Sequence, residues 1–536
     1  MSNQSEVLDV VVIGAGFSGL YALYRLRDVE GLNVRVFETG DGVGGTWYWN
    51  RYPGARCDSE SYYYSFSFSE ELDQEWVWSS KYPEHQEIRS YLNHVADRFD
   101  LRKDIQLTTR VAEAVYNDKT NLWDVQTEQG EQICARFLIS AVGCLSTANM
   151  PDIPGLDNFK GNFYHTGQWP QAGVDFSEKR VGLIGTGSTG IQATPVIAAE
   201  AEHLTIFQRT PNFTVPAQNA PVSNEDAASI KANYPEIRQA TKESRAGFPF
   251  TSNDRSCFDV SEEERLEIYE ALWQEGGFKF MWGSFNDIMI DKKANDTAAN
   301  FIRSKIHQIV NDSETAELLC PKGYPYGAKR PPIDTDYYVT FNRANVDLVD
   351  IQNAPIISLE ENGIRTESGF FELDTIVFAT GFDAMTGSLL KIDIRGSDGL
   401  KLSEKWSSGP RTYLGLQVSG FPNMFTITGP GSPSVLVNMP VAIEQHVDWI
   451  ADCIKHMNES GASKIEATEE AESEWVEHVH EIAKMTLFYE AKSWYLGVNI
   501  PGKPLVFMPY VGGMPLYKQY CEESVRDGYK GFEMSV

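Results

Sequence analysis

The sequence predicts an α/β protein with two Rossmann-like domains and a helical insertion in the second of them. Three observations support this fold class. The apolar run Val10–Ile13 leads into GAGFSG, and a second apolar run, Val181–Ile184, leads into GTGSTG. Within residues 221–330, charged stretches such as SEEERLEIYEALWQEGG and ANDTAANFIRSKIHQIVND instead show helical periodicity. The chain therefore repeats one strand–turn–helix unit and interrupts the second copy.

The first unit combines a glycine turn with an acidic residue at a fixed distance. Its glycines are Gly14, Gly16 and Gly19, and Glu38 follows Gly19 by nineteen positions at the end of the strand-like VRVFE. Such glycines let the backbone and the start of the next helix approach a pyrophosphate. The acid accepts hydrogen bonds from the hydroxyl groups of an unphosphorylated ribose. We therefore expect FAD to bind to this domain.

The second unit has the same glycine spacing but a basic residue in place of the acid. Its glycines are Gly185, Gly187 and Gly190, and Arg209 follows Gly190 by nineteen positions, closing LTIFQR. An arginine at this position binds a 2′-phosphate, so we expect NADPH here. Further residues expected at this site are Ser188, Thr189 and Thr210. Two such nucleotide sites indicate a redox enzyme.

Two similar strand-like segments mark where the chain passes from one domain to the other. ARFLISAVG ends in a glycine turn, and FELDTIVFATGFDA repeats that pattern, so we expect a crossing at each. The FAD-binding domain is expected to comprise residues 1–145 and 386–536. The NADP-binding domain is expected to comprise residues 146–220 and 331–385, with the helical insertion at residues 221–330.

Composition excludes several classes of partner. A formal net charge of −29 and a pI near 4.7 are unfavourable for binding nucleic acid or an anionic membrane. No apolar run approaches the roughly 20 residues of a membrane span, and MSNQSEVLD lacks the features of a signal peptide. We therefore expect a cytoplasmic monomer that binds neither nucleic acid nor membrane.

Cysteine and histidine spacing bears on two other classes of protein. The seven cysteines contain no CxxC pair, which favours reduced thiols and argues against a flavin-dependent disulfide reductase. His478 and His480 are two positions apart on an expected helix, so their side chains point to different faces. We expect no metal site.

Residues 159–170 read FKGNFYHTGQWP and match the pattern F-x-G-x-x-x-H-T-x-x-W-P. This pattern resembles the fingerprint of type I Baeyer–Villiger monooxygenases. Segments along the whole chain, including GGTWYWNRYPGARCD, GYPYGAKR, FATGFDA and KSWYLGVNIPGK, also resemble phenylacetone and cyclohexanone monooxygenases. The resemblance implies tightly bound FAD, hydride transfer from NADPH, and use of O₂ to convert a ketone to an ester or lactone through a C4a-peroxyflavin.

The resemblance also assigns catalytic residues. Arg330, at the end of GYPYGAKR, matches the catalytic arginine, whose permanent charge suits a peroxide anion and the oxyanion of the ketone adduct. Asp58, in GARCD, matches the acid implied to hold that arginine at the flavin. Lys329 is implied to bind the 2′-phosphate together with Arg209. His165, counted with the catalytic residues, is expected to couple NADPH binding to domain movement.

Other residues are assigned to the cofactors and the ketone in the same way. Trp494, in KSWYLG, is implied to cover the nicotinamide side of the site. The loop expected beside the FAD pyrophosphate and flavin includes Gly45, Thr46 and Trp47. The apolar contacts expected for the ketone are Leu145, Leu436 and Met439. Cys144 and Pro331-Pro332 depart from the phenylacetone-type pattern, so cyclic, aryl and linear ketones all stay open as substrates.

Three alternative functions stay open. A flavin monooxygenase could oxygenate sulfur or nitrogen, although Trp169-Pro170 and Arg330 count against this as the main activity. An NADPH oxidase that releases hydrogen peroxide would differ only in how well the peroxide is protected, and product analysis separates the two. A non-enzymatic nucleotide-sensing protein would show no NADPH turnover.

Overall fold

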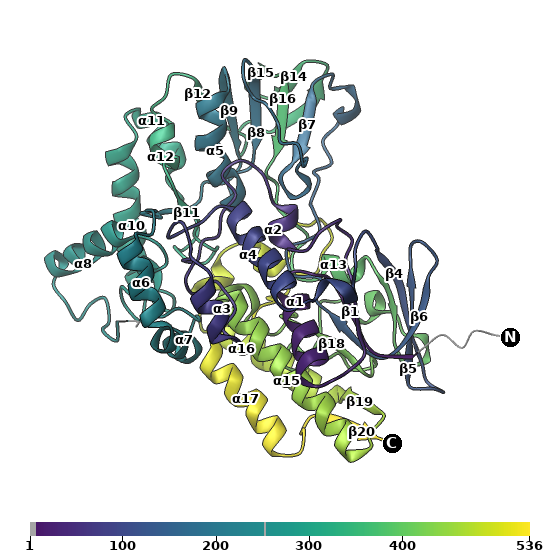
Figure 1. Cartoon of the computed structure of the whole chain (residues 1–536). Coiled ribbons are helices and arrows are strands. Elements are labelled where there is room, and N and C mark those ends of the chain that lie inside the picture. The colour runs from purple at the N-terminus through teal and green to yellow at the C-terminus, as the bar shows by residue number, and fades with distance from the viewer. Residues whose placement is uncertain (1–6, 251–252) are drawn as a thin grey trace.

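The computed structural model describes residues 7–250 and 253–536, and two large β-sheets organise it (Figure 1). The first sheet has the strand order β17-β4-β5-β6-β1-β2-β3, with β18 beside β6. Its strands are β1 Val7–Ile13, β2 Val34–Phe37, β3 Ile105–Gln106, β4 Val111–Asn117, β5 Leu122–Thr127, β6 Gln132–Ser140, β17 Asp393–Arg395 and β18 Met424–Thr426. Strands from residues 7–140 and from residues 393–426 thus share one sheet.

The middle of this sheet is parallel and buried. β1 pairs in parallel with β2 and β6, and β18 pairs in parallel with β6. Val10, Val11 and Val12 are fully buried. Val10 and Val12 pack with helices in one hydrophobic core, and Val11 packs with residues of β4 and β5 in another. A strand buried on both faces reads as a continuous apolar run, which explains the sequence before the first glycine turn.

The second sheet is entirely parallel, in the order β12-β9-β8-β16-β7. Its strands are β7 Asn162–His165, β8 Arg180–Ile184, β9 His203–Gln208, β12 Val346–Asp350 and β16 Thr375–Phe378. Three small sheets complete the strands: β10 Val215–Pro216 with β11 Ile333–Asp334, β13 Ile356–Glu360 with β14 Gly363–Thr366 and β15 Gly369–Glu372, and β19 Lys464–Ala467 with β20 Phe532–Ser535. The two parallel cores confirm the predicted fold class.

Helices cover both sheets, and none within the described ranges is long and apolar enough to cross a membrane. The helices outside residues 221–330 are α1 Phe17–Leu23, α2 Thr46–Trp49, α3 Glu70–Glu75, α4 His85–Arg98, α5 Ser188–Glu200, α12 Tyr337–Thr340, α13 Gly387–Leu390, α14 Leu402–Lys405, α15 Met439–Ser460, α16 Glu469–Lys484 and α17 Met514–Arg526. The long helix α15 packs against α1, so the end of the chain covers the first glycine unit.

In the described part of the expected insertion, residues 221–250 and 253–330, there are six helices. They are α6 Asn224–Ala232, α7 Tyr234–Glu243, α8 Glu262–Glu275, α9 Lys279–Trp282, α10 Lys292–Ile309 and α11 Ser313–Leu319. Of these, α6, α8, α10 and α11 lie at the left of Figure 1. Ser261, Asp291 and Asp312 each accept a backbone N–H at the start of a helix, which satisfies a donor that has no partner within the helix. The two charged stretches predicted to be helical, SEEERLEIYEALWQEGG and ANDTAANFIRSKIHQIVND, correspond to α8 and α10. The exact domain boundaries stay a prediction, which the strand pairing supports.

A buried histidine on α15 makes stability depend on pH. His446 accepts a hydrogen bond at Nδ1 from Thr428 N over 2.9 Å, and its Nε2 lies 2.8 Å from the Tyr517 hydroxyl. Burial lowers the pKa of His446 to about 3. In the unfolded chain this histidine has a pKa of about 6.5, so it binds a proton at a higher pH than folded His446 does. The contribution of His446 to the free energy of unfolding is therefore fully present above about pH 6.5 and is lost as the pH falls toward 3.

We expect the His446 contribution to the free energy of unfolding to fall by about 2 kcal/mol between pH 7.5 and pH 5. Urea unfolding of the wild type and of His446→Asn at both pH values measures it. The wild type should lose more stability than the variant across this interval, and equal losses would contradict the assignment.

Candidate functional site

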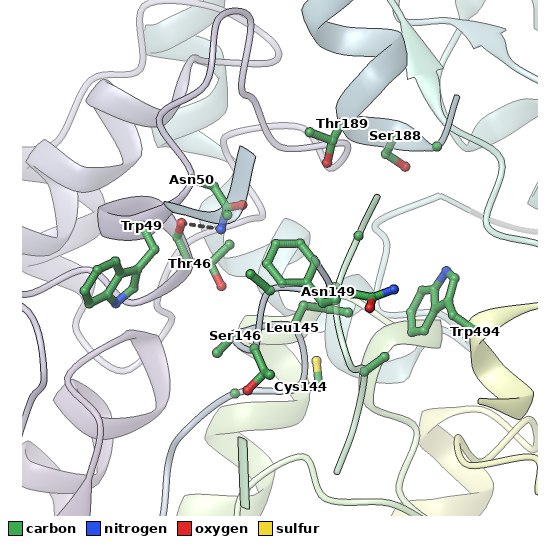
Figure 2. Close-up of a pocket in the computed structure, with 18 of the residues that line it drawn as sticks. Thr46, Trp49, Asn50, Cys144, Leu145, Ser146, Asn149, Ser188, Thr189 and Trp494 are labelled. Atoms are coloured by element: carbon green, nitrogen blue, oxygen red, sulfur yellow. Dashed lines mark hydrogen bonds between the residues drawn. The ribbon is translucent and has the colours of Figure 1, made fainter. Parts of the chain in front are cut away.

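One cavity of about 1170 Å³ lies where both sheets end. Its lining includes Ile13 and Phe37 at the carboxyl ends of β1 and β2, and Ile184 and Phe207 at the ends of β8 and β9. Ligands of open parallel sheets bind at this edge. Figure 2 shows the residues that surround the space: Thr46 of α2, Leu145 and Ser146 after β6, Ser188 and Thr189 of α5, and Trp494.

The structure brings most of the predicted site residues together around this cavity. Those that line it are Gly14, Gly16, Glu38, Gly45, Thr46, Trp47, Asp58, Leu145, Gly185, Gly187, Ser188, Thr189, Arg209, Thr210, Lys329, Arg330, Met439 and Trp494. Those outside the lining are Gly19, Gly190, His165 and Leu436.

The two outlying glycines have a packing role. A Cβ on Gly19 would lie 1.8 Å from Gly14 O, and a Cβ on Gly190 would lie 2.1 Å from Gly185 O. The absence of a side chain lets each helix start lie directly on its preceding turn, where Gly14 and Gly185 have φ of 107° and 112°. The third glycine of each motif therefore allows helix–strand contact rather than contact with a ligand.

At the first glycine turn, no capping side chain accepts from the first backbone N–H groups of α1. Gly16, the residue before α1, provides no side chain to accept the first N–H groups of the helix. Gly16 and Gly45 also approach closely, since a Cβ on Gly45 would lie 2.8 Å from Gly16 Cα. Glu38 is buried and accepts hydrogen bonds from Ala15 N over 2.9 Å and Gly40 N over 2.7 Å. These bonds fix the carboxylate at the cavity wall, where it can accept from ribose hydroxyls.

The second glycine turn is similar, but two basic residues, Arg209 and Lys329, line the cavity on its side. Gly187 likewise provides no side-chain cap for α5, and a Cβ there would meet nothing within 4 Å because the residue faces open space. Lys329 Nζ lies 4.3 Å from the centre of the Tyr324 ring. Burial and the charge of Arg209 lower the pKa of Lys329, and no acid within the described ranges forms an ion pair with either residue. The two uncompensated charges suit a dianionic phosphate.

Arg330 is held in a fixed orientation by a two-point ion pair. Its Nε and Nη2 donate to the two oxygens of Asp58 over 2.6 and 2.9 Å, and Nη1 donates to Val435 O over 2.6 Å. The guanidinium carbon lies 4.8 Å from the centre of the Phe278 ring. Three of the five N–H groups thus donate to Asp58 and Val435, which leaves one N–H on each terminal nitrogen. The Tyr495 hydroxyl also lies beside the guanidinium.

The electrostatics keep this arginine charged. Burial alone lowers the pKa of the Arg330 guanidinium, but the charge of Asp58 and its hydrogen bonds outweigh burial, so the pKa lies above its ordinary value. The side chains of Arg330 and Asp58 are 23% and 21% exposed, which leaves one side of the pair open to the cavity. The arrangement provides a permanent positive charge that can stabilise negative charge developing on a bound molecule.

His165 ends β7 and lies outside the cavity lining. It is 4% exposed, accepts from Gly167 N at Nδ1 over 3.0 Å, and its Nε2 lies 3.3 Å from Thr380 Oγ1. Burial lowers the pKa of His165, so the ring is neutral at neutral pH. These contacts tie the fingerprint segment to the strand end of β16 and favour a positioning role over proton transfer.

The expected apolar contacts are not all part of the cavity lining. Leu145 and Met439 line the cavity, whereas Leu436 does not. All three are partly buried and pack against the same hydrophobic core. Val435 and Val437, on either side of Leu436, are buried and line the cavity. Cys144 also lines the cavity, and burial raises the pKa of its thiol to about 11.

Two lining residues that join the domains were missed by the sequence analysis. The Tyr52 hydroxyl donates to Gln192 Oε1 over 2.8 Å, and Gln192 Nε2 donates to Arg56 O over 3.1 Å. The loop that carries Asp58 is therefore bonded directly to α5. Tyr52 lies in the segment GGTWYWNRYPGARCD, but nothing in the pattern distinguishes Gln192 from other helix residues.

Comparisons with known proteins agree on one family. Residues 8–217 match the family described as flavin-binding monooxygenase-like. The Baeyer-Villiger monooxygenase of Pseudooceanicola batsensis is 47% identical over 523 residues, 97% of this chain and 95% of that protein. The phenazine N-monooxygenase of Lysobacter antibioticus is 44% identical over 534 residues, 99% and 98% of the two chains. The crystal structure of OTEMO with FAD and NADP has a TM-score of 0.96 at 43% identity, covering 99% of this chain and 100% of that chain.

Proposed function

The chain belongs to the Baeyer–Villiger monooxygenase family, and from that membership we propose which of its residues carry the reaction. It is an FAD-containing, NADPH-dependent monooxygenase that uses O₂ to convert ketones to esters or lactones. The observation that carries the assignment of roles is the Asp58–Arg330 ion pair, which lies in a cavity lined by both glycine turns.

The residues present fit both nucleotides. At the first turn, the uncapped start of α1 suits a pyrophosphate, and Glu38 suits the adenosine ribose of FAD. At the second, the open space at Gly187 and the pair Arg209 and Lys329 suit NADPH and its 2′-phosphate. When bound, FAD takes a hydride from NADPH and activates O₂ for transfer of one oxygen atom to the ketone.

The protein's part in this chemistry is to position and stabilise charge. Arg330 presents its two remaining N–H groups to the negative charge that develops at the reacting oxygens, and Asp58 fixes the plane of the guanidinium. Leu145 and Met439 exclude water from the ketone, and Trp494 covers the other side of the cavity. His165 positions the fingerprint segment between the domains.

Oxygenation of nitrogen or sulfur is a second candidate activity. The phenazine N-monooxygenase relative favours it, because it matches nearly the whole of this chain. We propose ketone oxidation as the main activity, since the charge of Arg330 suits attack by an anion on a carbonyl. We also propose that the enzyme acts as a cytoplasmic monomer, which light scattering and cell fractionation test.

Product analysis with labelled oxygen tests the function. FAD-loaded enzyme is incubated with NADPH, ¹⁸O₂ and a panel containing cyclohexanone, phenylacetone, 2-decanone, a macrocyclic ketone, phenazine and an aryl sulfide. An ester or lactone with one ¹⁸O atom supports ketone oxidation. Labelled N-oxide or sulfoxide without ester would favour the second candidate. Hydrogen peroxide alone from every substrate would favour the oxidase.

Removing the cations at the second turn should change cofactor preference. Arg209→Ala is expected to raise the KM for NADPH about tenfold or more while leaving the KM for NADH nearly unchanged, because one hydrogen bond to a charged group contributes about 1.5–3 kcal/mol. Arg209→Ala combined with Lys329→Ala should raise it further. Steady-state kinetics with both nucleotides measure this, with NADH as the internal control. Equal effects on the two nucleotides would contradict the 2′-phosphate role.

A further inference from the structure

Three potential metal ligands gather on the insertion, outside the cavity. His307 lies near the end of α10, Glu317 lies on α11, and Cys320 directly follows α11. His307 Nε2 lies 3.3 Å from Glu317 Oε2 and 3.6 Å from Cys320 Sγ. The three ligand atoms all lie within 4.8 Å of one another, and within the described ranges this is the one such group of His, Cys and acidic residues.

The spacing of these atoms suits a shared ion. Zinc binds sulfur at about 2.3 Å, nitrogen at about 2.0–2.1 Å and carboxylate oxygen at about 2.0–2.2 Å. At tetrahedral angles, these lengths separate sulfur from nitrogen by about 3.6 Å and nitrogen from oxygen by about 3.3–3.4 Å. Both values agree with the separations found here.

We propose that His307, Glu317 and Cys320 form a zinc-binding site with water in the fourth position. Thiolate, imidazole and carboxylate together favour Zn²⁺ over Mg²⁺ or Ca²⁺, which prefer oxygen ligands alone. The side chains of His307 and Glu317 are 46% and 55% exposed, so an ion can enter from solvent and keep one water ligand. This proposal revises the expectation that the chain has no metal site, and it does not depend on the proposed function.

Contacts outside the group hold Glu317 and the backbone beside Cys320 in place. Lys322 Nζ pairs with Glu317 Oε1, so Oε2 is the oxygen that faces His307. Arg303 Nε donates to Pro321 O over 2.9 Å, which fixes the backbone beside Cys320 to α10. Outer contacts of this kind are usual around metal sites.

The proposed zinc site lies at the start of the segment that carries Lys329 and Arg330. Cys320 begins the segment CPKGYPYGAKR, whose last two residues are Lys329 and Arg330. A bound ion would join α10, α11 and the start of this segment. Because the ion binds the folded chain, Zn²⁺ should raise the Tm in a concentration-dependent manner.

Metal binding to the FAD-loaded enzyme tests the site. The protein, stripped with chelator and free of any affinity tag, is titrated with Zn²⁺ in a calorimeter and with Co²⁺ in a spectrophotometer. The wild type should bind one ion per chain and show a thiolate–Co²⁺ charge-transfer band. Cys320→Ser and His307→Ala should each lower Zn²⁺ affinity by more than the roughly 10- to 100-fold that loss of an outer contact costs. Both should also abolish the rise in Tm.

A matched variant controls for surface histidines in general. His203 Nε2 lies 2.9 Å from Asp347 Oδ2, and its side chain is 35% exposed. Among the described residues, this pair belongs to no group of three potential metal ligands. His203→Ala should bind Zn²⁺ as the wild type does. The proposal is overturned if the wild type binds no Zn²⁺, if Cys320→Ser and His307→Ala bind it with wild-type affinity, or if His203→Ala weakens binding equally. His307→Ala alters an exposed side chain, so it gives an answer even if Cys320→Ser fails to fold.

Discussion

Arg330→Ala is expected to slow ester formation about 10³-fold while NADPH still reduces the bound flavin. Arg330 lines the cavity, and in the proposed role its charge is needed only after reduction, where negative charge develops. Removing one such donor typically slows the chemical step about 10²- to 10³-fold, and removing the charge as well places this loss at the upper end of that range. Stopped-flow reduction of the flavin and product analysis measure the two steps separately.

Arg330→Lys provides the matched control for that experiment. It keeps a positive charge but lacks the planar fork that binds both oxygens of Asp58, and three bonds to Asp58 and Val435 O would leave no N–H for a ligand. Ester formation should therefore fall less than in Arg330→Ala but stay well below wild type. If Arg330→Ala formed ester at nearly the wild-type rate, the role proposed for this residue would be wrong.

Gly19→Ala is expected to prevent recovery of folded, FAD-loaded enzyme. The new Cβ would lie 1.8 Å from Gly14 O, a backbone atom in a turn with φ of 107° that cannot move without displacing β1 or α1. Such a contact must separate the helix start from the turn, which removes the site for the pyrophosphate. Expression yield and the ratio of flavin to protein absorbance measure the effect.

Gly187→Ala is the contrasting variant. Its Cβ would meet nothing within 4 Å, so folding and FAD content should be unchanged. Because the added methyl group would project into the NADPH side of the cavity, the KM for NADPH should rise. Normal FAD content in Gly19→Ala would contradict the packing role assigned to the third glycine.

The fold and the nucleotide ends of the site could be predicted because they depend on local patterns. Glu38 and Arg209 occupy fixed positions relative to their glycine turns, so spacing alone identifies them. Resemblance supplied Arg330 and Asp58, which no local pattern connects, since they are 272 residues apart. Placement of these two residues around the cavity supports their proposed roles.

Other features depended on contacts that spacing does not reveal. Leu436 belongs to an apolar loop at the cavity, yet its neighbours Val435 and Val437 line the cavity and Leu436 does not. Gln192 joins the domains only because the loop carrying Tyr52 packs against α5. His307 and Cys320 come from a helix and the end of the next helix, with no short motif to connect them.

In the proposed mechanism, the Asp58–Arg330 pair also limits when oxygen transfer can occur. Its two members come from distant segments, and Tyr52 and Gln192 join the Asp58 loop to the helix that begins the second glycine unit. A rotation that separated these segments would break both sets of bonds and release the guanidinium from the orientation described above. In that mechanism, the time for which the bonds persist would set an upper limit on the time available for oxygen transfer.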